Sequence, residues 1–303
     1  MATVTDVFFT PSAPRWRRFV AIGDSMTEGL CDEPGEPGDY RGWADLLAQS
    51  LTGRRTRAGR APLEYANLAI RGKLLGPILL TEQFPQALAA KPDLISIIGG
   101  GNDLLRPGGD PDVLGARLDR AVRAAREQGI DVLLATGMDT RRAGPLLTVM
   151  RPKVGIFNAH IWSVARTHGA HVMDIWGLRA LQDRRMWAPD RVHLSTLGHW
   201  RAAQAALDAL GLEPDDADWS KPLDTQARPA LPARLREDAT WIRRDVYPWA
   251  TRRFRRASSG DTRAAKRPDP IVLDTPGGLE HAAPGLGAAT NNQDARPDDG
   301  ERT

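Results

Sequence analysis

Residues 19–29 read FVAIGDSMTEG, an apolar run followed by Gly23, Asp24 and Ser25. The run is short and rich in aromatic and aliphatic residues, which is typical of a buried strand. A serine directly after such a strand can be a nucleophile at the end of a sheet. It can also cap a helix, because Ser25 to Glu28 matches the S-x-x-E capping box. These residues alone leave both interpretations open.

Four further apolar runs follow along the chain. Together with residues 18–22, the expected strands cover 63–68, 93–98, 131–136 and 171–175. Helical patterns lie between or after them, at 40–51, 73–90, 112–128, 148–167 and 195–210. Strands that alternate with helices predict an α/β fold, with a parallel sheet covered by helices on both faces. In open sheets of this kind, ligands bind beyond the carboxyl ends of the strands.

Residues suited to catalysis gather where these strands end. They are Ser25 after the first strand, Gly72 after the second, Asn102 after the third, and Asp190 and His193 after the fifth. Each has an ordinary alternative, such as a helix cap, a strand-ending glycine, turn chemistry or a surface loop position. Together they supply a hydroxyl nucleophile, a base that titrates near neutral pH and donors for an oxyanion, which acyl transfer requires.

The sequence therefore predicts a role for each residue in ester hydrolysis. Ser25 is the expected nucleophile, His193 the general base, and Asp190 the carboxylate that orients the imidazole. The backbone N–H groups of Ser25 and Gly72 and the side-chain amide of Asn102 are the expected oxyanion donors. No metal ion and no cofactor are expected.

Four blocks of the chain resemble the signature of the SGNH, or GDSL-type, hydrolase family. They are Gly23-Asp24-Ser25, Gly72, Gly100-Gly101-Asn102-Asp103 and Asp190-x-x-His193, in the family's order. The resemblance covers residues 16–211 and implies a flavodoxin-like three-layer α/β/α fold with a five-stranded parallel sheet. It also implies the same triad and oxyanion hole, with esterase, lipase or lysophospholipase, thioesterase or carbohydrate deacetylase activity. Met26 departs from the Leu of the literal GDSL string.

Other residues near these blocks could contact a substrate. They are Asp24 and Asp103, which flank the catalytic positions, Arg71, and Met138 at the start of the 138–151 loop. The alternative for the two aspartates is hydrogen bonding that holds their loops, and for Arg71 a solvated loop position. Cys31 is expected to be a buried structural thiol, and His199 a poor alternative base.

The chain changes in character after Gly211. We divide it into an N-terminal arm (1–15), a hydrolase domain (16–211), a linker with a possible basic helix (212–256) and a disordered tail (257–303). Between residues 234 and 267, eleven Lys/Arg stand against four Asp/Glu. Such a run is usually solvated, but it could make weak contact with an anionic membrane. The Arg-, Trp- and Pro-rich segment is similar to tails of bacterial, particularly actinobacterial, family members.

Composition limits the remaining possibilities. The single cysteine excludes an intramolecular disulfide and a multi-cysteine zinc site. Without a recognisable signal peptide or a long apolar span, a cytoplasmic protein is expected. The expected partner is a small-molecule ester, with no nucleic acid, and the oligomeric state is left open. The alternative is a non-catalytic flavodoxin-like module for a small ligand or nucleotide, although neither G-x-G-x-x-G nor a P-loop occurs.

Overall fold

The structure is a computed structural model that describes residues 14–32, 40–142, 145–224, 230–246, 260 and 262–274. Within these residues the chain forms a six-stranded sheet in the order β5-β4-β3-β1-β2-β6. The strands are β1 (Arg18–Gly23), β2 (Glu64–Asn67), β3 (Leu94–Ile98), β4 (Asp131–Ala135), β5 (His171–Met173) and β6 (Arg267–Val272). The first five are parallel, whereas β6 runs antiparallel to β2.

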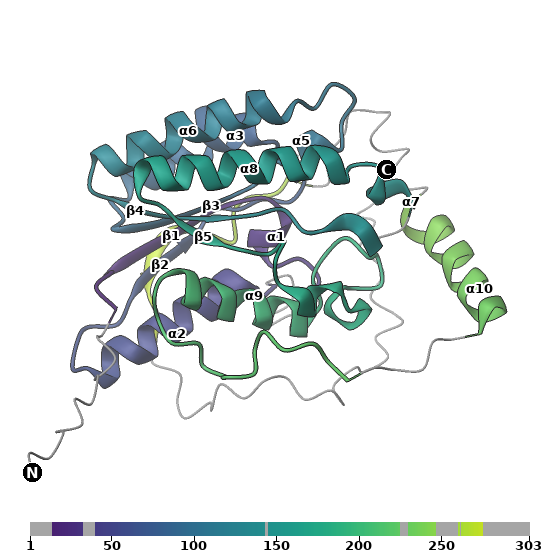
Figure 1. Ribbon diagram of the computed structural model, residues 1–303. Coiled ribbons are helices and arrows are strands. Elements are labelled where there is room, and N and C mark those ends of the chain that lie inside the picture. The colour runs from purple at the N-terminus through teal and green to yellow at the C-terminus, as the bar shows by residue number, and fades with distance from the viewer. Residues whose placement is uncertain are drawn as a thin grey trace, which may run out of the picture.

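Helices cover both faces of the sheet, which confirms the predicted three-layer α/β fold (Figure 1). One face carries α2 (Trp43–Arg57) and α9 (Thr196–Ala209), and the other carries α3 (Leu75–Leu80), α4 (Gln83–Ala89), α6 (Pro111–Glu127) and α8 (Arg151–His168). Along β1, Phe19 and Ala21 pack into the first core, and Val20 and Ile22 into the second. Successive strand side chains point to opposite faces, so a strand covered on both sides is apolar throughout.

The connections of β1 create a topological switch point in the sheet. β1 stands between β2 and β3, so the chain leaves it on one side and later returns on the other. Ligands bind at such a switch point, beyond the carboxyl ends of the strands. Two short helices, α1 (Ser25–Glu28) and α5 (Gly101–Leu104), begin there. They carry Ser25 and Asn102, and the Asn102 amide bonds Asp24, the residue before Ser25.

The helix predicted over 73–90 is wrong, because the structure has two helices, α3 and α4, separated at Thr81 and Glu82. Pro85 lies in the first turn of α4. Its nitrogen carries no proton and cannot donate to the carbonyl of Thr81, as one continuous helix would require. The apolar spacing of the segment is helical throughout, but the proline divides it into two helices.

The strand β6 lies in the segment for which the sequence predicted disorder. It adds to the outer edge of β2, and Lys266 next to it bonds Asp45 of α2 at 2.6 Å. Its sequence, RPDPIV, has no clear alternation, and prolines in strands are confined to edge positions such as this one. The strand forms because the edge of β2 offers backbone partners, which no local pattern announces.

Part of the segment predicted as a linker packs on the core, and a helix follows it. Leu212, Trp219 and Leu223 pack against the core beside α9, and Arg201 of α9 bonds the carbonyl of Lys221 at 2.9 Å. The helix begins at Leu231, and α10 (Leu231–Trp241) continues into a π-helical turn over Ile242–Val246. Residues 247–259, which complete the predicted linker and begin the predicted tail, lie outside the described residues.

Candidate active site

Ser25, His193 and Asp190 are joined by hydrogen bonds at the carboxyl edge of the sheet. The Oγ of Ser25 lies 2.9 Å from Nε2 of His193, and Nδ1 of His193 lies 2.6 Å from Oδ2 of Asp190. The other carboxylate oxygen, Oδ1, accepts the backbone N–H groups of Val192 and His193 at 2.9 and 3.0 Å. The hydrogen bonds thus connect the Ser25 hydroxyl to the His193 imidazole, and the imidazole to the Asp190 carboxylate, which the backbone holds in orientation.

The turn that presents Ser25 is held by the residues before it. Asp24, not Ser25, caps α1, because its carboxylate accepts the N–H of Met26 at 3.2 Å. A Cβ on Gly23 would lie 2.3 Å from the carbonyl oxygen of Ile98, so glycine lets the ends of β1 and β3 approach. The alternative that Ser25 caps the helix is therefore wrong, and its hydroxyl is directed to the imidazole of His193 instead.

Glu28, the other half of the predicted capping box, pairs with Arg71. The Arg71 Nε bonds Oε1 at 2.9 Å, and its backbone N–H bonds Oε2 at 2.6 Å. The guanidinium also lies 5.3 Å from the centre of the Tyr40 ring. Arg71 is buried, so the alternative of a solvated loop arginine is wrong. The pair joins α1 to the loop that carries Gly72.

The expected oxyanion donors are Ser25 at the start of α1, Gly72 in the loop after β2 and Asn102 on α5. Gly72 has φ +74°, a left-handed conformation that favours glycine. The side-chain amide of Asn102 donates to Oδ2 of Asp24 at 3.2 Å and to the carbonyl of Lys73 at 3.1 Å. Asn102 is thereby placed between the residue before Ser25 and the residue after Gly72. The oxyanion role of these donors stays a prediction.

The remaining candidates for substrate contact are engaged within the protein. Asp103 is buried and accepts the N–H of Leu75 at 2.9 Å, so it caps α3 from outside that helix. Burial raises the pKa of Asp103, and it raises the pKa of Asp24 to about 6. Met138 is partly buried and packs against the core beside α2 and α9. These contacts explain structural roles for Asp24, Asp103 and Met138, and substrate contact stays a prediction.

His193 and Asp190 shift each other's protonation. Burial lowers the pKa of His193, but the hydrogen bond to Asp190 and the neighbouring Cys31 raise it by more, so it lies above its ordinary value. Burial raises the pKa of Asp190, and the hydrogen bond from His193 reverses this and holds it below its ordinary value. The pairing thus favours the imidazolium that forms when the base takes a proton.

Cys31 departs from the expectation of a buried structural thiol, and it lies beside Asp190. It is only partly buried, and its Sγ lies 3.9 Å from Oδ2 of Asp190. Within the part of the chain that the structure describes, Cys31, Asp190 and His193 form the one group of three side chains that could hold a metal ion. A metal there would compete for the atoms that bond His193 to Asp190, and we assign none. The expectation of a metal-free enzyme stays a prediction.

His199 is placed as expected, away from the nucleophile. Its Nδ1 accepts the N–H of Trp43 at 3.3 Å and its Nε2 lies 3.2 Å from the carbonyl of Leu30. Burial lowers the pKa of His199 to about 4, so the ring is neutral at physiological pH. It serves to fix the loop after α1.

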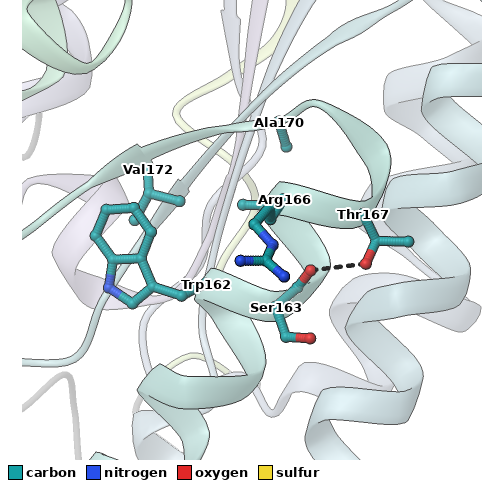
Figure 2. Close-up of a pocket in the computed structure, with 7 residues that line it drawn as sticks. Trp162, Ser163, Arg166, Thr167, Ala170 and Val172 are labelled. Carbon is teal, nitrogen blue, oxygen red and sulfur yellow. Dashed lines mark hydrogen bonds between the residues drawn. The ribbon is translucent and has the colours of Figure 1, made fainter.

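A surface hollow lies at the end of α8 and the start of β5. Figure 2 shows Trp162, Ser163, Arg166 and Thr167 of the helix beside Val172 of the edge strand. The Thr167 hydroxyl donates to the Ser163 carbonyl at 2.9 Å. No triad or oxyanion candidate lines this hollow, and we assign it no part in the site.

One contact near the triad has no counterpart in the predictions from sequence. The indole N–H of Trp241 on α10 donates to the backbone carbonyl of Asp190 at 2.8 Å. The two residues are 51 positions apart, and a tryptophan in a basic helix carries no sign of such a partner. Only the fold brings them together.

The sequence profile of the GDSL-like lipase/acylhydrolase family matches residues 21–201, more than half of the chain. The chain belongs to this family and is an ester-hydrolysing serine hydrolase. The alternative of a non-catalytic binding module is set aside on this ground. A search of curated proteins finds no match.

Several solved structures share the fold. A variant of Axe2, an acetyl xylan esterase from Geobacillus stearothermophilus, matches at 22% identity and a TM-score of 0.55, covering 65% of this chain and 95% of its own. LAE5, an α/β hydrolase enzyme from the metagenome of Lake Arreo, Spain, matches at 24% identity and 0.53, covering 64% and 95%. TesA matches at 25% identity and 0.51, covering 64% and 97%. About a third of this chain therefore has no counterpart in these three structures.

A membrane-spanning helix would need a long, apolar segment, and none of the helices in the described ranges meets that requirement.

Proposed function

We propose that the protein hydrolyses carboxylic esters through a triad of Ser25, His193 and Asp190. The observation that carries this proposal is the unbroken hydrogen-bond chain, 2.9 Å from hydroxyl to imidazole and 2.6 Å from imidazole to carboxylate. A nucleophile and a base within hydrogen-bond reach, with a third group that orients the base, is the arrangement required for acyl transfer.

The proposed reaction has two halves. The Oγ of Ser25 attacks the ester carbonyl while Nε2 of His193 takes its proton, and Asp190 stabilises the imidazolium through Nδ1–H. The imidazolium then gives the proton to the departing alcohol, which leaves an acyl group on Ser25. Water then gives a proton to the same nitrogen as it attacks the acyl group. The bond from the acyl carbon to the Ser25 oxygen breaks, the imidazolium returns the proton to that oxygen, and the acid is released.

The negative charge that forms on the ester oxygen needs preorganised donors. We assign this role to the backbone N–H groups of Ser25 and Gly72 and to the amide of Asn102. The hydrogen bond from Asn102 to Asp24 supports the assignment, because it holds the amide next to the residue that precedes the nucleophile.

The substrate class is a small or medium acyl ester, a lysophospholipid or an acetylated sugar. Acetylated xylooligosaccharides belong in any screen, since several structures of similar fold are acetylxylan esterases. The test compares wild type and Ser25→Ala on nitrophenyl esters of increasing acyl length, acetylated sugars and lysophospholipid. We expect Ser25-dependent turnover of at least one class. Turnover that persists in Ser25→Ala would refute the assignment of Ser25 as the nucleophile.

A weak contact with an anionic membrane is a second, separate proposal. Leu231, Leu235 and Ile242 are exposed at 63%, 59% and 52%, and the exposed Arg236, Arg243 and Arg244 lie on the same helical segment. Apolar and basic side chains together favour anionic lipid surfaces. Co-sedimentation with phosphatidylserine vesicles at low salt should fall in Leu235→Ser, and equal binding of the variant would remove the proposal. A cytoplasmic location and the absence of a nucleic-acid partner stay predictions.

A further inference from the structure

The C-terminal helix α10 contacts the turn that carries the proposed catalytic acid and base. Trp241 donates its indole N–H to the carbonyl of Asp190 at 2.8 Å, and Asp238 accepts a bond from the guanidinium of Arg191 at 2.6 Å. That guanidinium also lies 4.6 Å from the centre of the Trp241 ring. Both contacts come from the last turn of α10, whose Trp241 is 7% exposed.

The turn at residues 190–193 has a conformation that contacts from the rest of the protein must stabilise. Arg191 has φ +62°, a conformation that costs a non-glycine residue on the order of 1 kcal/mol or more and persists where surroundings hold it. The same short turn must keep Asp190 within 2.6 Å of His193. Its own bonds, from Val192 and His193 to the carboxylate, hold one side. Trp241 and Asp238 add two contacts from α10, one to the carbonyl of Asp190 and one to the guanidinium of Arg191.

The burial of the Arg191 charge also indicates that α10 stabilises this turn. The side chain of Arg191 is only 13% exposed, and Asp238 is the carboxylate to which it bonds. A guanidinium that is mostly removed from water needs such a partner. Without Asp238, Arg191 would favour a position in solvent, and its backbone would move with it.

This contact lies outside the part of the chain that defines the family. The family match ends at residue 201, whereas α10 spans Leu231–Trp241 (Figure 1). The solved structures described above cover at most 65% of this chain while covering 95% or more of their own. The helix is thus an addition to the hydrolase domain.

We propose that Trp241 and Asp238 are positioning residues for the triad, which hold the Asp190–His193 turn in its catalytic geometry from a helix outside the hydrolase domain. The proposal rests on the proposed function, because it concerns the same triad. Neither residue touches the nucleophile. Their effect passes through the backbone of Asp190 and Arg191 to the separation of Asp190 from His193.

The test uses the full chain with Trp241→Phe, which keeps the ring but removes the donor, and Asp238→Asn, which keeps the shape but removes the charge. Loss of one such hydrogen bond corresponds to about a 3- to 10-fold decrease in kcat. KM should change less than about twofold, since neither side chain reaches the substrate. Trp162→Phe on α8 and Glu237→Gln on α10 are the matched controls. Both should have the kcat and KM of the wild-type enzyme.

The pH profile separates positioning from mere stabilisation. A looser Asp190–His193 bond lowers the pKa of His193, so the acid limb of kcat/KM should move to lower pH in both variants. A change in the unfolding midpoint alone would not move that limb. Unchanged kcat and an unchanged acid limb in both variants would overturn the proposal.

A second readout does not depend on turnover. The proton shared by Asp190 and His193 should give a far-downfield ¹H NMR resonance. We expect this resonance to broaden or shift in Trp241→Phe and to keep its position and width in Trp162→Phe. If no ester were hydrolysed, the proposed function would fail while this resonance still tested the positioning. A resonance that is identical in Trp241→Phe and wild type would contradict the positioning itself.

Discussion

The predicted hydrolase domain (residues 16–211) contains Ser25, His193 and Asp190, whereas the C-terminal extension (the described residues of 212–274) contacts the backbone of Asp190 and of the residue before Gly72. Trp241 bonds the carbonyl of Asp190. Gly260 lies so near the loop before Gly72 that a Cβ on it would be 2.0 Å from the carbonyl oxygen of Arg71. The comparison teaches that the proposed catalytic residues lie in short sequence blocks. Some contacts that hold these blocks in place come from a segment that has no recognisable motif.

The extension itself has two different attachments. At α10 it contacts the turn that carries Asp190 and His193 directly. At β6 it contacts the sheet, where Lys266 pairs with Asp45 and both side chains are about nine-tenths buried. The first attachment should affect catalysis and the second stability. The following variants test this division.

The largest effect is expected from Asp190→Asn in the hydrolase domain. An amide in place of the carboxylate should reduce kcat by about 10⁴-fold, because it no longer selects the reactive imidazole tautomer. Asp190 raises the pKa of His193, so the neutral base is gained only as pH rises through that raised value. The variant should therefore also move the acid limb of kcat/KM to lower pH. A limb at the wild-type position would show that Asp190 does not act on His193.

Asn102→Ala should come next. Loss of one oxyanion donor typically decreases kcat by about 10²- to 10³-fold. The side chain is only partly buried, so urea unfolding should change little. The measurement is kcat and KM on a nitrophenyl ester, beside the unfolding curve. A decrease in stability with normal kcat would reduce Asn102 to a structural residue that bonds Asp24 and Lys73.

Glu28→Ala probes the support inside the hydrolase domain. The change leaves the guanidinium of Arg71 without its carboxylate, in a pair whose side chains are 10% and 11% exposed. Breaking such a pair lowers the free energy of unfolding by about 3 kcal/mol. Glu28→Gln, which can still accept the backbone N–H of Arg71, should lose less. Equal and negligible losses in urea titrations of both variants would contradict the role of this pair.

Lys266→Met in the extension should have the smallest effect, and only on stability. Asp45 retains Arg267 at 3.6 Å, so we expect a loss of about 1–3 kcal/mol in unfolding free energy with unchanged kcat. Lys221→Met is the matched control, because its pair with Asp218 is 68% and 64% exposed and such pairs contribute little. A decrease in kcat for Lys266→Met comparable to that of Trp241→Phe would erase the distinction between the two attachments.

The sequence was sufficient for the parts of this account that depend on local patterns. Apolar runs located β1 to β5, and the residues at their ends proved to lie together, as Ser25 and His193 show across 168 positions. What could not be predicted depends on tertiary contact. The Glu28–Arg71 pair, the edge strand β6 and the contact of Trp241 with Asp190 all join residues that are distant in the sequence and whose partners are set by the fold. Cys31 beside Asp190 belongs to the same group.

The most direct test of the proposed triad is to find the acyl group. Wild-type enzyme is mixed with p-nitrophenyl acetate, quenched in acid during the steady state, and its peptides are analysed by mass spectrometry. The account predicts one acetyl group on the peptide that contains Ser25, absent in Ser25→Ala and slow to leave in Asp190→Asn. Steady turnover with an acetyl group on another residue, or turnover that persists in Ser25→Ala, would contradict it.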